Sequence, residues 1–242
     1  MTPISPPACN PADKDSLLWQ RALVGALGGI LLLGWLARLA DGRLGDLALL
    51  WLRGLVLPVG GAGAGVLVLG WGRWPGLLSR LELTLPEGAS RRAMLAGCGA
   101  GVGAFALAIP LVWLSQAVFG GWLPETPPPP LTDLLTATAG RAVWVAVFVQ
   151  VLVLAPLAEE LLFRLFLAES FRAQGLARPA WPMALVFALV HARLDQAAGL
   201  CVLALWLYRL RCRHESLLPA VLAHAVFNAL ALVGACWSLF GG

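Results

Sequence analysis

Charged residues are scarce in this chain: Asp, Glu, Lys and Arg make up 12% of its 242 residues, about half the share found in an average soluble domain. A surface that faces water cannot be built from so few charges, and the 60% hydrophobic composition also excludes a disordered chain. The formal net charge of +4 is small and its basic residues are scattered. The charge pattern therefore predicts no nucleic-acid partner.

Cysteine, lysine and tyrosine are also few. The five cysteines are odd in number and form no CxxC pair, which argues against a disulfide scaffold or a zinc knuckle. One Lys stands against sixteen Arg, and one Tyr against eleven Trp; Arg and Trp both anchor helix ends at membrane surfaces. The preference for Arg over Lys, with abundant Ala, Leu and Gly, favours a GC-rich bacterial genome and hence a bacterial inner membrane.

Long apolar runs fill most of the sequence, and the mean hydropathy is +0.81. A membrane-spanning helix needs about 20 mostly apolar residues. The runs predict an all-α, polytopic bundle of about seven spanning helices, with six to eight acceptable. The predicted spans are 17–40, 47–72, 93–122, 142–158, 183–194, 197–210 and 217–240. We divide the chain into a polar tail (1–16), N-terminal membrane helices with a Pro-rich link (17–140) and a C-terminal core (141–242).

Basic residues set the expected orientation of the bundle. Segments 73–92, 164–178 and 209–213 are rich in Arg and fall on one side, which the positive-inside rule makes cytoplasmic, together with the N-terminus. The link 38–53 then lies on the opposite side despite its three Arg. Small residues four apart predict close helix packing in the first three spans. These pairs are Gly25/Gly29, Gly61/Gly65, Gly97/Gly101 and Gly99/Gly103.

Three clusters of polar residues lie within or against the last four predicted spans, where an ionisable group is costly unless it is paired or hydrated. They are Glu159, Glu160 and Arg164; then His191; then His224 with Asn228. Counted from the basic end of their spans at 1.5 Å per residue, Glu159, His191 and His224 lie about 7, 13 and 10 Å deep. Three helices thus bring a carboxylate and two imidazoles to similar depth.

Spacing within the clusters predicts different roles for the two acids. Glu160 and Arg164 are four residues apart and can pair on one helix face, while Glu159 is rotated by about 100° and remains free for chemistry. Phe187, four residues before His191, can pack beneath its imidazole. His224 and Asn228, also four apart, can direct two polar groups at one point.

This set of residues suits hydrolysis of an amide without a covalent intermediate. A carboxylate with a His can hold and deprotonate water, and a second His with an Asn can stabilise an oxyanion. Zinc bound by Glu159, His191 and His224 is the nearest alternative, although the sequence contains no HExxH. A serine nucleophile is disfavoured because GxSxG is absent, and Cys201 remains open as a nucleophile in an apolar setting.

The clusters resemble the motifs of the CPBP family, the CAAX-protease and bacteriocin-processing intramembrane proteases. That family carries EExxxR, FxxxH and HxxxN or HxxxD on successive membrane helices. This chain has Glu159-Glu160 with Arg164, Phe187 with His191, and His224 with Asn228, in that order. The resemblance covers roughly residues 142–235, under half of the chain. One departure is Leu165, where many members have Gly after the Arg.

The resemblance implies a glutamic-type intramembrane endopeptidase with no cofactor and no metal. In it, Glu159 is the base that activates water, His191 helps to position that water, and His224 and Asn228 form the oxyanion hole. Glu160, Arg164 and Phe187 support the site. The implied partners are the lipid bilayer and a membrane protein or peptide substrate: a sorting-signal anchor, a leader peptide or a CAAX-like tail. The alternatives are a zinc-dependent protease, a non-catalytic immunity or scaffold protein, and a transporter or proton channel that uses the same polar residues.

Overall fold

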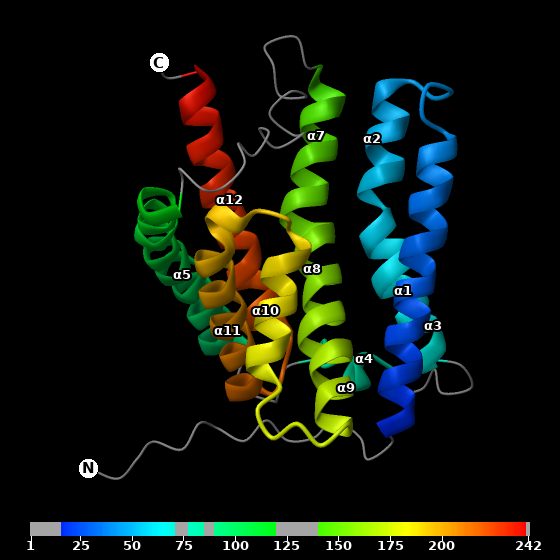
Figure 1. Cartoon of the computed structure of the whole chain (residues 1–242), viewed down its shortest axis with the longest axis vertical. Coiled ribbons are helices and arrows are strands. Elements are labelled where there is room, and N and C mark those ends of the chain that lie inside the picture. The colour runs from blue at the N-terminus through cyan, green and yellow to red at the C-terminus, as the bar shows by residue number, and fades with distance from the viewer. Residues whose placement is uncertain (1–15, 71–76, 85–89, 120–139, 241–242) are drawn as a thin grey trace.

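The protein is a bundle of α-helices in a computed structural model (Figure 1). The structure describes residues 16–70, 77–84, 90–119 and 140–240, and these contain no β-strand. Within these described residues, five helical stretches are long and apolar enough to cross a membrane. The predicted polytopic all-α bundle is therefore confirmed. Nearly all of the predicted tail (1–16) and of the Pro-rich link lies outside the described residues.

In the part of the chain that the structure describes, the helices follow one another in seven main stretches. The first is α1 (Ser16–Leu39), and the second joins α2 (Asp46–Gly54), the π-helix η1 (Val56–Gly63) and α3 (Ala64–Gly70). A short α4 (Leu77–Arg80) precedes the long α5 (Ser90–Phe119). The fourth main stretch runs through α7 (Arg141–Val149), η2 (Gln150–Leu154), α8 (Ala155–Glu159), η3 (Glu160–Leu167) and α9 (Ala168–Ala173). Last come α10 (Ala180–Val190), a 3₁₀ turn η4 (Leu194–Gln196), α11 (Ala197–His214) and α12 (Leu218–Phe240).

The fourth stretch differs most from the sequence prediction. Its apolar run was expected to end at residue 158 and to reach the basic side near Arg164. Instead the helix continues to Ala173 as one span of 33 residues, and Arg164 is fully buried. The charged residues do not end the helix because they are paired inside the bundle, as described below. Glu159 lies fourteen residues before Ala173, roughly 20 Å from that end of the helix, whereas the sequence prediction counted about 7 Å from Arg164.

Two π-helices interrupt this long span: η2 ends five residues before Glu159, and η3 begins at Glu160. In an α-helix an N–H bonds to the carbonyl four residues earlier, and in a π-helix to the carbonyl five residues earlier. Where η2 and η3 return to α geometry, one carbonyl is therefore passed over. The sequence predicted a disturbance with freed carbonyls at Pro156, and η2 ends two residues before it.

Glycines let the bundle close around this helix. A Cβ added at Gly29 would collide with the backbone of Gly60, where α1 crosses η1. Gly65 faces the ring of Phe166 on η3 in the same way. Gly97 and Gly101 on α5 meet the backbone of α12, so this predicted small-residue pair is a packing face. The pair Gly99/Gly103 is not, because Gly99 faces open space and Gly103 makes only ordinary contact with Trp206.

Gly101 offers a direct test of how tightly α5 packs against α12. A Cβ at this position would meet the carbonyl oxygen of Ala223, the residue before His224. It would also lie 2.8 Å from Val226 Cβ. We expect Gly101→Leu to lower the free energy of unfolding by about 1–3 kcal/mol, as overpacking does. Thermal unfolding of the detergent-solubilised protein measures this. Gly99→Leu, with nothing within 4 Å of its added Cβ, is the matched control and should leave stability near wild type.

Several helix ends gather at one end of the bundle. Figure 1 shows the start of α1, the ends of α9 and α11 and the starts of α10 and α12 at one end of the molecule. The turn between α10 and α11 stops about half way along the bundle, because α10 has only eleven residues. His191, the first residue after α10, belongs to this turn, and its side chain is 32% exposed.

Candidate active site

The Glu160–Arg164 pair predicted from spacing is present and fully buried. Glu160 Oε2 lies 3.1 Å from Arg164 Nε, and neither side chain is exposed. On its other oxygen, Glu160 Oε1 is 2.9 Å from Nδ1 of His224 on α12. One carboxylate thus binds a cation on its own helix and an imidazole from another, which compensates its burial.

Glu159 faces the two histidines instead. Its Oε2 lies 3.9 Å from Nε2 of His191 and 3.7 Å from Nε2 of His224. This oxygen is buried and has no hydrogen-bond partner in the described part of the chain. Both distances are too long for a direct hydrogen bond, and a water about 2.8 Å from each atom could bridge them. The arrangement is thus a carboxylate oxygen with two imidazole nitrogens around one point.

Hydrogen bonds assign the tautomers of both histidines. His191 Nδ1 is 2.7 Å from the carbonyl oxygen of Phe187, which can only accept, so Nδ1 carries the proton. His224 Nδ1 likewise donates to the Glu160 carboxylate. In the neutral rings Nε2 is then the acceptor that each histidine presents toward Glu159.

Phe187 is the residue against which the site packs. Its ring lies 4.6 Å from the His191 ring, as the spacing predicted, and 6.2 Å from the His224 ring. The guanidinium of Arg164 lies over the same ring at 4.3 Å, a cation–π contact that adds to the ion pair with Glu160. Phe187 is fully buried, so it fixes these groups relative to one another.

His191 is aimed by the end of its helix. It is the C-cap residue of α10, and Ala192 after it has φ +52, the left-handed conformation that ends helices. Arg193 and Asp195 follow, joined by two hydrogen bonds of 3.0 and 2.9 Å. The turn that follows His191 thus carries an acid and a base that are paired with each other.

Asn228 contacts the main chain of the long helix. At the end of η2, the N–H of Ala155 bonds to Gln150 O, and Pro156 has no N–H. The carbonyl of Val151 is therefore passed over, and Asn228 Nδ2 donates to it at 3.0 Å. The same amide nitrogen carries a second N–H. Asn228 and His224 thus each bind a different part of the helix that carries Glu159.

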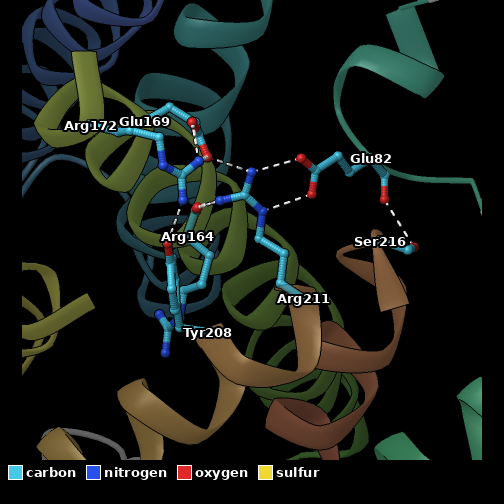
Figure 2. Close-up of polar contacts among 7 residues, drawn as sticks. All are labelled: Glu82, Arg164, Glu169, Arg172, Tyr208, Arg211 and Ser216. Carbon is cyan, nitrogen blue, oxygen red and sulfur yellow. Dashed lines mark hydrogen bonds and ion pairs between the residues drawn. The ribbon is translucent and has the colours of Figure 1, made fainter. Parts of the chain in front are cut away.

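Sequence reasoning missed a second polar cluster, near the end of the bundle where α9 and α11 end (Figure 2). Arg211 is 1% exposed and bonds to the carboxylates of Glu82 and Glu169. The sequence predicts only that segments 73–92 and 209–213 are rich in Arg and lie on the same side of the membrane. The local sequence does indicate one ion pair of this cluster, because Glu169 and Arg172 are three residues apart. Their further partners, Glu82 and Arg211, lie far away in the sequence.

The sequence left two other chemistries open, a metal site and a cysteine nucleophile. Among residues 16–70, 77–84, 90–119 and 140–240, no group of three or more His, Cys, Asp or Glu is arranged to hold a metal ion. Cys201 is half-buried on α11, and its thiol contacts the carbonyl of Ala184 at 3.6 Å. None of the contacts seen in the structure joins Cys201 to a histidine.

One comparison with known proteins finds a match. Residues 140–230 match the protein-family model described as type II CAAX prenyl endopeptidase Rce1-like. No curated protein and no solved structure matches the chain. The matched segment contains all three clusters and confirms the family resemblance predicted from them. Together with the apolar helices, the match supports the assignment of the chain as a multi-pass membrane protein similar to CAAX-type intramembrane endopeptidases.

Proposed function

From the place of residues 140–230 in the Rce1-like family, we propose that the protein is a glutamic-type intramembrane endopeptidase. The observation that carries this proposal is the buried Oε2 of Glu159, which has no hydrogen-bond partner and has an imidazole Nε2 on either side. A buried carboxylate oxygen without a partner is costly, and such groups gather at functional sites. A bound water satisfies it and is the nucleophile the reaction needs.

In the proposed mechanism, this water donates hydrogen bonds to Glu159 Oε2 and to His191 Nε2. Glu159 takes a proton as the water oxygen attacks the carbonyl carbon of the scissile amide. The resulting oxyanion is stabilised by the second amide N–H of Asn228 and by the Nε2–H of protonated His224, which Glu160 supports. Glu159 then delivers the proton to the amide nitrogen. The C–N bond breaks, and an amine and a carboxylic acid leave.

The geometry of the site indicates where the scissile bond must lie, but it does not single out one substrate class. All reacting groups are carried by helices inside the bundle, so the scissile bond must enter a membrane-embedded site. Three substrate classes fit this requirement: C-terminal sorting-signal anchors, leader peptides and CAAX-like tails. A bacterial inner-membrane origin, as the composition favours, makes a peptide or a protein anchor the better candidate than a prenylated tail.

A cellular experiment tests the proposal and identifies the substrate together. Wild type, Glu159→Ala and His224→Ala are expressed to equal levels, and membrane and surface proteins are compared for new terminal peptides. We expect specific terminal peptides in wild type that both variants lack. Identical peptide sets in all three would contradict the protease proposal and favour the immunity or scaffold alternative. A second experiment separates the glutamic from the zinc-dependent reaction. The purified enzyme is assayed with and without a chelator, and it is analysed for bound zinc.

A further inference from the structure

The end of η3 leaves one backbone carbonyl without its usual helical donor. The N–H of Ala168 bonds to Phe163 O and Leu165 O, so it passes over the carbonyl of Arg164, four residues before it. Nη1 of Arg211, on α11, donates to this carbonyl oxygen. In Figure 2 only the backbone oxygen of Arg164 meets Arg211, while its side chain points away from the cluster. A side chain from a neighbouring helix thus completes the π-to-α transition, as Asn228 does at η2.

Arg211 is held in place by two carboxylates. Its Nε and Nη2 bond to the two oxygens of Glu82 at 2.7 and 2.6 Å, and Nη2 also bonds to Glu169 Oε1 at 2.8 Å. Glu169 is in turn held by Arg172 at 2.6 Å, and Arg172 Nη2 donates to the hydroxyl of Tyr208. Two acids and two arginines balance in charge. A planar guanidinium is needed here because three acceptors lie in different directions around one side chain.

Glu82 brings the N-terminal half of the chain into contact with this cluster. It lies between α4 and α5 with φ +53, a conformation that is uncommon for a residue other than glycine. Its carbonyl oxygen accepts from Leu217 N at 2.8 Å and from Ser216 Oγ at 3.1 Å, at the turn before α12. The backbone of Glu82 is thus tied to α12, and its carboxylate to α11. Strained positions of this kind persist only where surrounding contacts impose them.

We propose that Arg211 is a positioning residue: it fixes the rotation of η3 through the Arg164 carbonyl, with Glu82 as its anchor. Glu160 and Arg164 both lie on η3, and Glu159 immediately precedes it. A helix turns by about 100° per residue, so a change of register at η3 would move both carboxylates away from the histidines. The inference rests on the proposed function, and it assigns a role to the N-terminal half: supplying the acid that holds Arg211.

Arg211→Lys tests the proposal because it keeps the buried charge but cannot reach three acceptors at once. Arg213→Lys, an exposed position on the same helix, is the matched control. The rate of amide hydrogen exchange in residues 160–169 reports how firmly η3 is held by the contact between Arg211 and the Arg164 carbonyl. This measurement does not depend on catalysis. With the substrate found as above, kcat and KM are measured for both variants and for Glu82→Gln, alone and combined with Arg211→Lys.

We expect Arg211→Lys to raise exchange in residues 160–169 and to lower kcat at least about 10-fold, with KM within about 2-fold of wild type. Glu82→Gln should act in the same direction and add little in the double variant, because it works through Arg211. Unchanged exchange at 160–169, or faster exchange with wild-type kcat, would overturn the positioning role. If the wild-type protein cleaves nothing, the proposed function fails, and the exchange measurement alone then decides whether Arg211 fixes η3.

Discussion

Glu159→Gln should reduce cleavage by the purified protein by about 10²- to 10⁴-fold, the range expected for loss of a general base. Glutamine has nearly the same shape and can still bind a water, but it cannot accept the proton. Stability should change little, because Glu159 Oε2 has no hydrogen-bond partner among the described residues and the side chain is partly exposed. The measurement is kcat/KM on the identified substrate, with thermal unfolding of the same samples.

Two comparisons sharpen this prediction. Glu215→Gln changes an exposed acid at the end of α11 and should leave kcat/KM at the wild-type value. Glu160→Gln should lower both stability and activity, since Arg164 would lose its countercharge. A Glu159→Gln enzyme that retains more than about a tenth of wild-type kcat/KM would lie far outside the expected range and remove Glu159 as the base.

Much of the fold follows from hydropathy, because a helix in lipid must satisfy its own backbone and present apolar side chains. This reasoning located all seven main stretches. It failed at the end of the fourth, where a sequence window containing Glu159, Glu160 and Arg164 looks like a membrane boundary. The compensating groups, His224 and Phe187, come from other helices. Pairing across helices cannot be read from the local sequence.

The candidate site was predictable where its contacts are local. The Glu160–Arg164 and Phe187–His191 contacts both follow from a spacing of four residues. The orientation of Asn228 does not, because it depends on which carbonyl the end of η2 passes over. The Arg211 cluster was missed for a different reason: acids and arginines in short links usually face water, and only the folded chain brings Glu82 to Arg211.

Arg164→Met should be the most destabilising single change near the site. It leaves the Glu160 carboxylate fully buried, with His224 as its remaining partner. Breaking a buried pair by removing one member costs about 3–5 kcal/mol. The cation–π contact with Phe187 is lost as well. Denaturant or thermal unfolding of the solubilised protein measures the loss, and cleavage should fall with it.

An exposed pair provides the matched control. Arg53 bonds to Asp41 at 2.9 Å near the link between α1 and α2, and both side chains are more than half exposed. Because water screens such pairs, Arg53→Met should cost no more than about 1 kcal/mol. Equal stability losses for the two variants would show that the burial of Arg164 carries no special weight, and would contradict the prediction.

The double variant Glu160→Gln with Arg164→Met separates stability from chemistry. With both charges gone, no unpaired ion stays buried, and stability should recover much of the loss seen in Arg164→Met. Cleavage should not recover, because an amide in place of the Glu160 carboxylate cannot stabilise a protonated His224. A double variant that regains both would mean that the pair serves only to hold the helices together. One that regains stability alone assigns to Glu160 a part in the reaction through His224.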